Sequence, residues 1–121
     1  DGAGLSQLLN DRCAQSPIQR IEHLEHLAVL PAGPVPPNPQ ELLSRPSFAR
    51  TLGSCARSYA FIVIDTPPLA SCGDALVAAR GCGGALVVGR RNRSRLGRIS
   101  AAIDMLRAVA VLPVGTVEND P

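Results

Sequence analysis

The segment Phe61-Ile62-Val63-Ile64-Asp65-Thr66-Pro67-Pro68 decides the fold class of this 121-residue chain. Four large apolar residues in succession, closed by an acid and two prolines, are typical of a strand that is buried on both faces and ends at Asp65. An acid held at the end of such a strand can orient Mg²⁺ or its waters beside nucleotide phosphates, as a Walker B acid does. Asp-Thr-Pro is also good turn chemistry, so Asp65 either orients a metal or caps a turn.

Outward from this segment, short apolar runs alternate with helical patterns. Further strands are expected at 27–30, 85–88 and 111–117, beside the one at 60–64. Uninterrupted apolar strands that alternate with helices predict an α/β fold, with a parallel sheet and helices on both faces. The carboxyl ends of these strands should meet at one edge, where ligands of open parallel sheets bind. That edge would carry residues 31–34, 65–68, 90–93 and 118–120.

Helix signals fill the intervals between the strands. A short helix is expected within residues 1–10, and a longer one from Asn38 to about Arg57, because Asn38 is a good N-cap ahead of a proline. Residues 75–80 predict a helix that Gly81 ends. Ser94 is placed to cap a last helix, whose apolar stripe has helical spacing. The stripe consists of Leu96, Ile99, Ile103 and Leu106.

Composition predicts a folded chain with one small core. Apolar residues make up 45% of the chain and charged residues 18%, which excludes disorder driven by high charge. At this length we expect one domain over residues 1–121. The sequence has no apolar run long enough for a membrane span, and its four cysteines form no Cys-x-x-Cys pair. These features predict reduced thiols and a cytoplasmic location.

A cluster of arginines follows the predicted strand at 85–88. It consists of Arg90, Arg91, Arg93, Arg95 and Arg98. Such a density of charge attracts anions, and Arg90, Arg91 and Arg93 are the candidate anion-binding residues. A nucleotide phosphate, a phosphotyrosine tail and anionic lipid all fit this chemistry, and so does a solvated helix face without a ligand. Nucleic acid is not expected as a partner, because aromatic side chains that could stack on bases are scarce.

Four segments together resemble a known family. They are Ile64-Asp65-Thr66-Pro67-Pro68, the proline-rich stretch from Leu30 to Leu43 (LPAGPVPPNPQELL), Gly4 to Leu9 (GLSQLL) and Gly115 to Asp120 (GTVEND). In order and spacing they resemble the bacterial tyrosine kinases of capsule and exopolysaccharide synthesis, with the chain-length determinant branch nearest. These kinases are P-loop proteins of the partition and cell-division ATPase superfamily.

The resemblance implies an ATP-dependent autokinase that regulates polysaccharide chain length, polymerisation and export. ATP and Mg²⁺ would be its cofactors, with Asp65 as the catalytic and metal-orienting acid and with Thr66, Pro67 and Asn119 at the nucleotide. The implied partners are a membrane co-polymerase subunit and the tyrosine-rich tail of a neighbouring subunit in a homo-oligomer. The implied location is the cytoplasmic face of the membrane, reached through a partner or a further segment.

The chain departs from the family pattern in one decisive respect. All twelve of its basic residues are arginine, so it cannot supply the lysine of a P-loop. The expectation is therefore the C-terminal portion of a kinase domain, whose sheet lacks the P-loop strand and helix. Two alternatives stay open: a non-catalytic nucleotide-fold module that docks to a co-polymerase, and a fragment of a partition-type ATPase.

Overall fold

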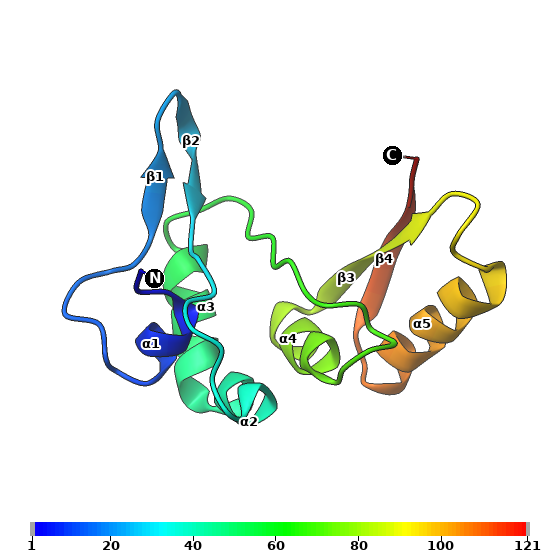
Figure 1. The fold of residues 1–121 in the computed structure, drawn as a ribbon, viewed down its shortest axis with the longest axis horizontal. Coiled ribbons are helices and arrows are strands. Elements are labelled where there is room, and N and C mark those ends of the chain that lie inside the picture. The colour runs from blue at the N-terminus through cyan, green and yellow to red at the C-terminus, as the bar shows by residue number, and fades with distance from the viewer. Residues whose placement is uncertain (1, 121) are drawn as a thin grey trace. The chain divides into compact units, whose positions relative to one another are not determined.

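A computed structural model describes residues 2–120 of the chain. The contacts within it form two compact units, Asp1–Ser58 and Tyr59–Pro121, which we call unit 1 and unit 2 (Figure 1). Each unit has its own helices and its own two-stranded sheet. The expectation of one partial domain over residues 1–121 stays a prediction.

Unit 1 has a small helical core. Its helices are α1 (Leu5–Leu9), α2 (Pro39–Ser44) and α3 (Pro46–Ala56), which pack against one another. Each helix contributes one large apolar side chain to this core, and these residues, Leu9, Leu42 and Phe48, are no more than 5% exposed. The short helix expected within residues 1–10 is confirmed by α1.

The helix expected over residues 38–57 begins where it should but is broken once. Asn38 is the N-cap of α2, with Pro39 in the first turn. Arg45 then has an extended backbone, with φ −72° and ψ 150°, because the ring of Pro46 disfavours helical geometry in the residue before it. A new helix, α3, starts at Pro46 itself, where a missing N–H costs nothing. The single long helix is therefore a wrong prediction.

Two glycines bring the start of α1 against the proline-rich loop. The Leu5 and Ser6 amides donate to the carbonyl oxygens of Pro31 (2.7 Å) and Ala32 (3.0 Å). A side chain at Gly4 would collide with the backbone of Gly33, which has a φ of +77°. Glycine is therefore required at both positions for this close approach. Two of the segments that carry the family resemblance thus meet in unit 1.

The strand expected at 27–30 forms in a different setting. It is part of β2 (Leu24–Val29), which pairs antiparallel with β1 (Gln19–Ile21) rather than within a parallel sheet. His23 lies in the connecting turn with a φ of 67°. Leu24, Leu27 and Val29 are each at least 40% exposed. The buried parallel strand is a wrong prediction, because an apolar run indicates a strand without indicating its neighbour.

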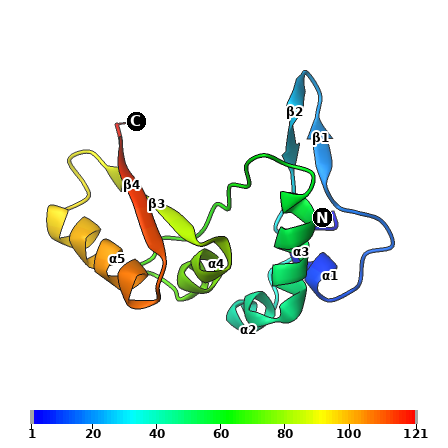
Figure 2. The ribbon, with the colours of Figure 1, turned by 180° about the vertical axis from the view of Figure 1, so that it is seen from behind.

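Unit 2 is an α/β unit with a parallel strand pair. Its elements are α4 (Asp74–Cys82), β3 (Gly84–Arg90), α5 (Leu96–Ala108) and β4 (Leu112–Asn119). The strands β3 and β4 are parallel, and α5 forms the crossover between them and packs against both, while α4 packs against β3 (Figure 2). The α/β class with a parallel sheet and helices is therefore confirmed. The strands predicted at 85–88 and 111–117 correspond to β3 and β4.

The boundaries of the helices in unit 2 differ from the expected ones. Helix α4 continues past Gly81 to Cys82 and is capped by Gly83, whose left-handed φ of 77° is typical of a glycine that ends a helix. Ser94 does not cap α5, which begins at Leu96 with Arg95 as its N-cap. The hydroxyl of Ser94 instead accepts a hydrogen bond from the Arg90 amide (2.8 Å). Local spacing thus located both helices but misplaced their ends.

The segment that indicated the fold class is not a strand among the residues described. Residues 59–68 have no regular secondary structure, and Phe61 and Val63 are 89% and 90% exposed. A strand needs a neighbour to pair its backbone groups, and no described residue pairs with this segment as a strand. The buried strand at 60–64 is therefore a wrong prediction for this structure. Phe61, Ile62 and Val63 are exposed, and Ile64 is partly buried.

The sheet of unit 2 also has one open face. Gly89 faces α5, since a side chain there would meet Ile99, so its neighbour Val88 points to the opposite face. Leu86 and Val117 share that face with Val88, because the register pairs Val88 with Val117. These three side chains are 43–63% exposed. The described helices do not cover this part of the sheet.

We expect the isolated chain to self-associate through these apolar surfaces, because contiguous exposed apolar patches are rare in stable monomers. Light scattering over a concentration series should give a mass that rises with protein concentration. The double variant Val88→Thr/Val117→Thr keeps β-branched residues in the strands and should lower that mass. A monodisperse monomer at all concentrations would contradict this expectation.

Candidate functional site

The carboxyl ends of β3 and β4 bring two of the predicted site segments together. Arg90 pairs with Asn119 in the parallel register, and the Arg91 amide donates to the Asn119 carbonyl oxygen (2.9 Å). The Arg91 guanidinium lies 3.1 Å from the Asp120 carboxylate and 4.0 Å from that of Glu118. Both partners are exposed, so these ion pairs contribute little to stability. The prediction that segments 90–93 and 118–120 share one edge is confirmed.

The turn after β3 is tightly built. The Arg90 amide donates to the Ser94 hydroxyl, and the Ser94 amide donates to the Arg90 carbonyl oxygen (2.8 Å each). Asn92 has a φ of 58°, which asparagine tolerates better than most residues. All residues from 90 to 98 are exposed. The turn therefore presents the arginines of the cluster outward.

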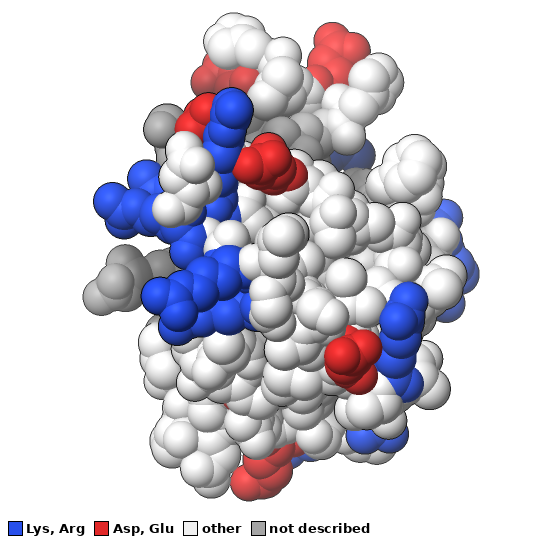
Figure 3. Space-filling model, turned by 90° about the vertical axis from the view of Figure 1, so that its right-hand side faces the viewer, with Lys and Arg blue, Asp and Glu red and all other residues white. Residues whose placement is uncertain are grey.

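Charge on unit 2 is unevenly distributed. Among the described residues, Arg91 is the one arginine of the cluster with a salt-bridge partner. Arg90, Arg93, Arg95 and Arg98 face solvent. Figure 3 looks at the side of Figure 1 that carries α5, and basic side chains gather toward one part of that view. The structure thus provides an exposed cationic surface rather than an enclosed anion pocket.

Asp65, Thr66 and Pro67 make no polar contact with this edge in the part of the chain that the structure describes. Asp65, Thr66 and Pro67 are exposed and lie in the irregular segment 59–68. No hydrogen bond or ion pair in the described part of the chain joins Asp65 to Arg90, Arg91 or Asn119. Asn119 is the last residue of β4 and is exposed, and its carbonyl is used by Arg91. The structure therefore assembles the arginine side of the predicted site and leaves Asp65 unpartnered in residues 2–120.

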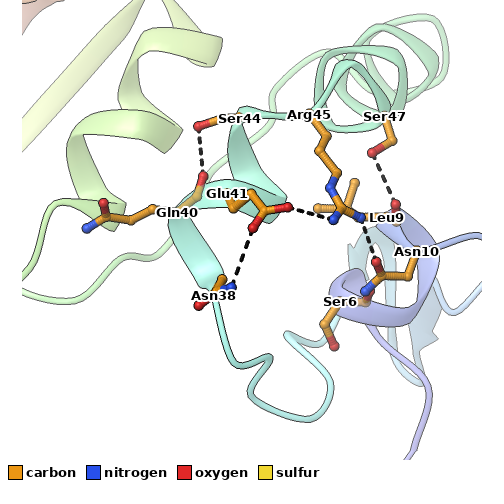
Figure 4. A network of polar contacts seen from close by, with 9 residues as sticks. All are labelled: Ser6, Leu9, Asn10, Asn38, Gln40, Glu41, Ser44, Arg45 and Ser47. Carbon is orange, nitrogen blue, oxygen red and sulfur yellow. Dashed lines mark hydrogen bonds and ion pairs between the residues drawn. The ribbon is translucent and has the colours of Figure 1, made fainter.

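A polar network in unit 1 was missed by sequence reasoning. Arg45 donates to Glu41 and to the Asn10 side chain (2.9 Å each), so one guanidinium joins α2 to the end of α1 (Figure 4). Ser47 donates to the Leu9 carbonyl oxygen (3.1 Å), which ties α3 to α1. The hydrogen bond and charge of Arg45 hold the pKa of the Glu41 carboxyl below its ordinary value, with a smaller contribution from Asn38. The four-residue spacing of Glu41 and Arg45 was the sequence signal for the Glu41–Arg45 ion pair.

The same network borders a shallow hollow of about 250 Å³. Its lining residues are Leu9, Asn10, Asp11, Arg45, Pro46, Ser47 and Arg50. Arg45 is already held by Glu41 and Asn10, and the hollow is open to solvent. The described residues also contain no group of three or more metal-ligating side chains. The contacts of Arg45 and Ser47 therefore join the three helices of unit 1.

Comparison with known proteins identifies relatives over nearly the whole chain. CapB of Staphylococcus aureus, named a tyrosine-protein kinase, is 34% identical over 119 residues, which cover 98% of this chain and 52% of CapB. The chain is homologous to the bacterial tyrosine-protein kinases. No family model matches it. The resemblance to this family that the sequence indicated is therefore confirmed.

Solved structures of bacterial tyrosine kinases have the same fold as this chain. The kinase domain of the Escherichia coli tyrosine kinase Etk has a TM-score of 0.90 at 30% identity, covering 97% of this chain and 46% of that domain. The chimerical protein CapA2B2 has a TM-score of 0.86 at 32% identity and covers 96% of this chain. The chain spans about half the length of CapB and of the Etk kinase-domain structure. Its fold is therefore a partial P-loop kinase fold.

No helix among the described residues is long and apolar enough to cross a bilayer.

Proposed function

We propose that this chain is the part of a protein-tyrosine autokinase that bears the Walker B acid, a transferase that moves phosphate from ATP to protein tyrosines in capsule or exopolysaccharide synthesis. One observation carries the proposal: 98% of the chain matches CapB at 34% identity. The fold agreement with the Etk kinase domain supports it. Regulation of chain length, polymerisation and export would follow from such an activity in the complete protein.

Asp65 is the residue we propose as the metal-orienting and catalytic acid. Its exposed carboxylate follows an apolar run, and carboxylate oxygens are the donors that Mg²⁺ prefers. In the bound state Mg²⁺ would neutralise charge on the phosphates of ATP. Thr66, Pro67 and Asn119 would line the nucleotide-binding site. Arg90 and Arg91 lie beside Asn119 and would face the phosphates of the nucleotide or another anion. Arg93 would extend that anion-binding surface.

The phosphate cradle must come from outside these 121 residues. A P-loop lysine contacts the phosphates directly, and the chain contains no lysine. The residues present thus fit Mg²⁺ at Asp65 but do not by themselves fit the triphosphate. Transfer by this chain requires a second segment that carries the Gly-rich loop and its lysine.

The proposed partners follow the same homology. They are a membrane co-polymerase subunit and the tyrosine-rich tail of a neighbouring kinase subunit, within a homo-oligomer at the cytoplasmic face of the membrane. The arginine surface at the end of β3 fits an acidic or phosphorylated tail in charge. Nucleic acid is not proposed as a partner.

The proposal is tested with a chimera in which this chain replaces the matching stretch of CapB. We expect the chimera to incorporate label from radioactive ATP into tyrosine, while the isolated chain incorporates none, because the Gly-rich loop supplies most of the electrostatic stabilisation. Thermal unfolding and nucleotide binding establish that the chimera is folded. A folded, nucleotide-binding chimera without tyrosine phosphorylation would favour a non-catalytic module instead. Nucleotide hydrolysis without any tyrosine labelling would favour a partition-type ATPase.

A further inference from the structure

The first turn of α5 and the loop before it form a surface of which the proposed kinase chemistry uses Arg90, Arg91 and Arg93 but not Arg95, Leu96 or Arg98. This surface, the α5 arm, comprises residues 90–98, which carry the arginine cluster and Leu96. Leu96 is the first residue of α5 and is 84% exposed. The sequence placed Leu96 on the buried stripe of this helix, and the structure places it outside.

The position of Leu96 has a geometric cause. Ile99, three residues later on the same helix, already lies against Gly89, which is next to the last residue of β3. Leu96 lies almost one helical turn before Ile99, toward the N-terminus of α5, and therefore projects past the carboxyl end of β3. Burial in the core of unit 2 is not available to it. A large apolar side chain is left at the tip of a cationic surface.

The cations on the α5 arm are available for a partner. Glu118 and Asp120 contact Arg91, and in the described chain neither carboxylate contacts Arg93, Arg95 or Arg98. The hydrogen bonds that close the turn use the backbone of Arg90 and the amide and hydroxyl of Ser94, and they leave the guanidinium groups exposed. The arm therefore combines outward-facing guanidinium groups with one exposed leucine.

We propose that the α5 arm is a direct contact to an anionic lipid bilayer. Guanidinium groups bind phosphate oxygens of lipid headgroups, and Leu96 enters the boundary between headgroups and acyl chains. A binding site for a single soluble phosphate would bring its donors together around a pocket, whereas these arginines are exposed and spread over nine residues of chain. A single-stranded nucleic acid would require aromatic side chains for stacking, and none lies between residues 90 and 98.

The contact would be weak in one copy and sensitive to salt. Each basic residue near an anionic surface contributes about 1 kcal/mol, or roughly fivefold in affinity. Stable membrane attachment usually needs two signals, and here the second would be Leu96 or further copies of the arm in an oligomer. The inference goes beyond the proposed function, because it places the chain at lipid without a partner protein.

The test is flotation of the full 121-residue chain with vesicles, after centrifugation to remove aggregates. We expect the chain to float with phosphatidylcholine vesicles that contain phosphatidylglycerol and to stay behind with pure phosphatidylcholine. High salt should release it, since the Debye length falls from about 10 Å at 0.1 M to about 3 Å at 1 M. The triple variant Arg93→Gln/Arg95→Gln/Arg98→Gln should bind on the order of a hundredfold more weakly.

Two controls separate the arm from net charge. The variant Arg12→Gln/Arg20→Gln/Arg57→Gln removes the same charge from unit 1, and its binding should stay within a few-fold of the parent. Leu96→Ser should lower binding on the order of tenfold through lost apolar burial, with unchanged thermal unfolding. Equal losses in the two triple variants would overturn the proposal.

The remaining outcomes also decide the matter. Failure of the parent chain to float with phosphatidylglycerol vesicles would overturn the proposal. Saturable binding of inorganic phosphate or of a tyrosine-phosphorylated peptide that removes the chain from vesicles, with no effect of Leu96→Ser, would assign the arm to a soluble anion instead. The kinase activity of the CapB chimera is a separate readout, so failure of the proposed function would leave this test unaffected.

Discussion

Asp65→Asn in the CapB chimera is expected to reduce tyrosine autophosphorylation by roughly 10²–10³-fold at a nearly unchanged melting temperature. Asparagine keeps the shape and most of the turn hydrogen bonding of aspartate but loses the negative charge that orients Mg²⁺. Asp65 is exposed in the structure and has no ion-pair partner in residues 2–120, so little folding energy depends on its charge. The measurement is label transfer from radioactive ATP beside thermal unfolding of the same preparation.

A matched acid controls for loss of charge in unit 2. Asp74 lies in the first turn of α4, where its carboxylate favours the helix dipole. Asp74→Asn should lower the free energy of unfolding by about 0.3–1 kcal/mol and leave label transfer intact. Full activity in Asp65→Asn would overturn its assignment as the metal-orienting acid. The capping alternative predicts that outcome, with a stability change of about 1 kcal/mol.

Local signals in the sequence predicted the elements that depend on local chemistry. The sequence predicted the Asn38-Pro39 start of α2, the apolar run of β3 and the order α4, β3, α5 and β4 in unit 2. Each follows from residues within one or two turns of the element. The spacing of the family segments was equally informative, and homology to tyrosine-protein kinases confirmed it.

Features that depend on distant partners could not be predicted in this way. The run Ala60-Phe61-Ile62-Val63-Ile64 has every property of a buried strand, yet burial requires neighbouring strands, and residues 2–120 provide none beside it. The hairpin of β1 and β2 depends on pairing that the apolar pattern of 27–30 does not specify. The contact of Arg45 with Asn10 could not be predicted either, because the two residues are 35 positions apart in the sequence. For the candidate site, the edge at Arg90 and Asn119 was predictable from topology, and the roles of Asp65, Thr66 and Pro67 stay predictions.

The two phenylalanines of the chain allow a buried and an exposed aromatic side chain to be compared directly. Phe48 of α3 is 3% exposed in the core of unit 1, whereas Phe61 is 89% exposed in the irregular segment. Phe48→Ala should lower the free energy of unfolding by about 3–5 kcal/mol, because it removes a buried ring and leaves a cavity beside Leu9 and Leu42. A small domain has only about 5–15 kcal/mol in total, so much of unit 1 should unfold in this variant.

Phe61→Ala serves as the matched control, since it makes the same chemical change at an exposed position. Its free energy of unfolding should stay within about 0.5 kcal/mol of the parent. Urea unfolding followed by circular dichroism measures both variants, at a protein concentration low enough to limit self-association. A loss at Phe61 as large as that at Phe48 would show that residues 60–64 are buried in solution. The strand that the sequence predicted would then exist, with another copy of the chain as the available source of its missing neighbour.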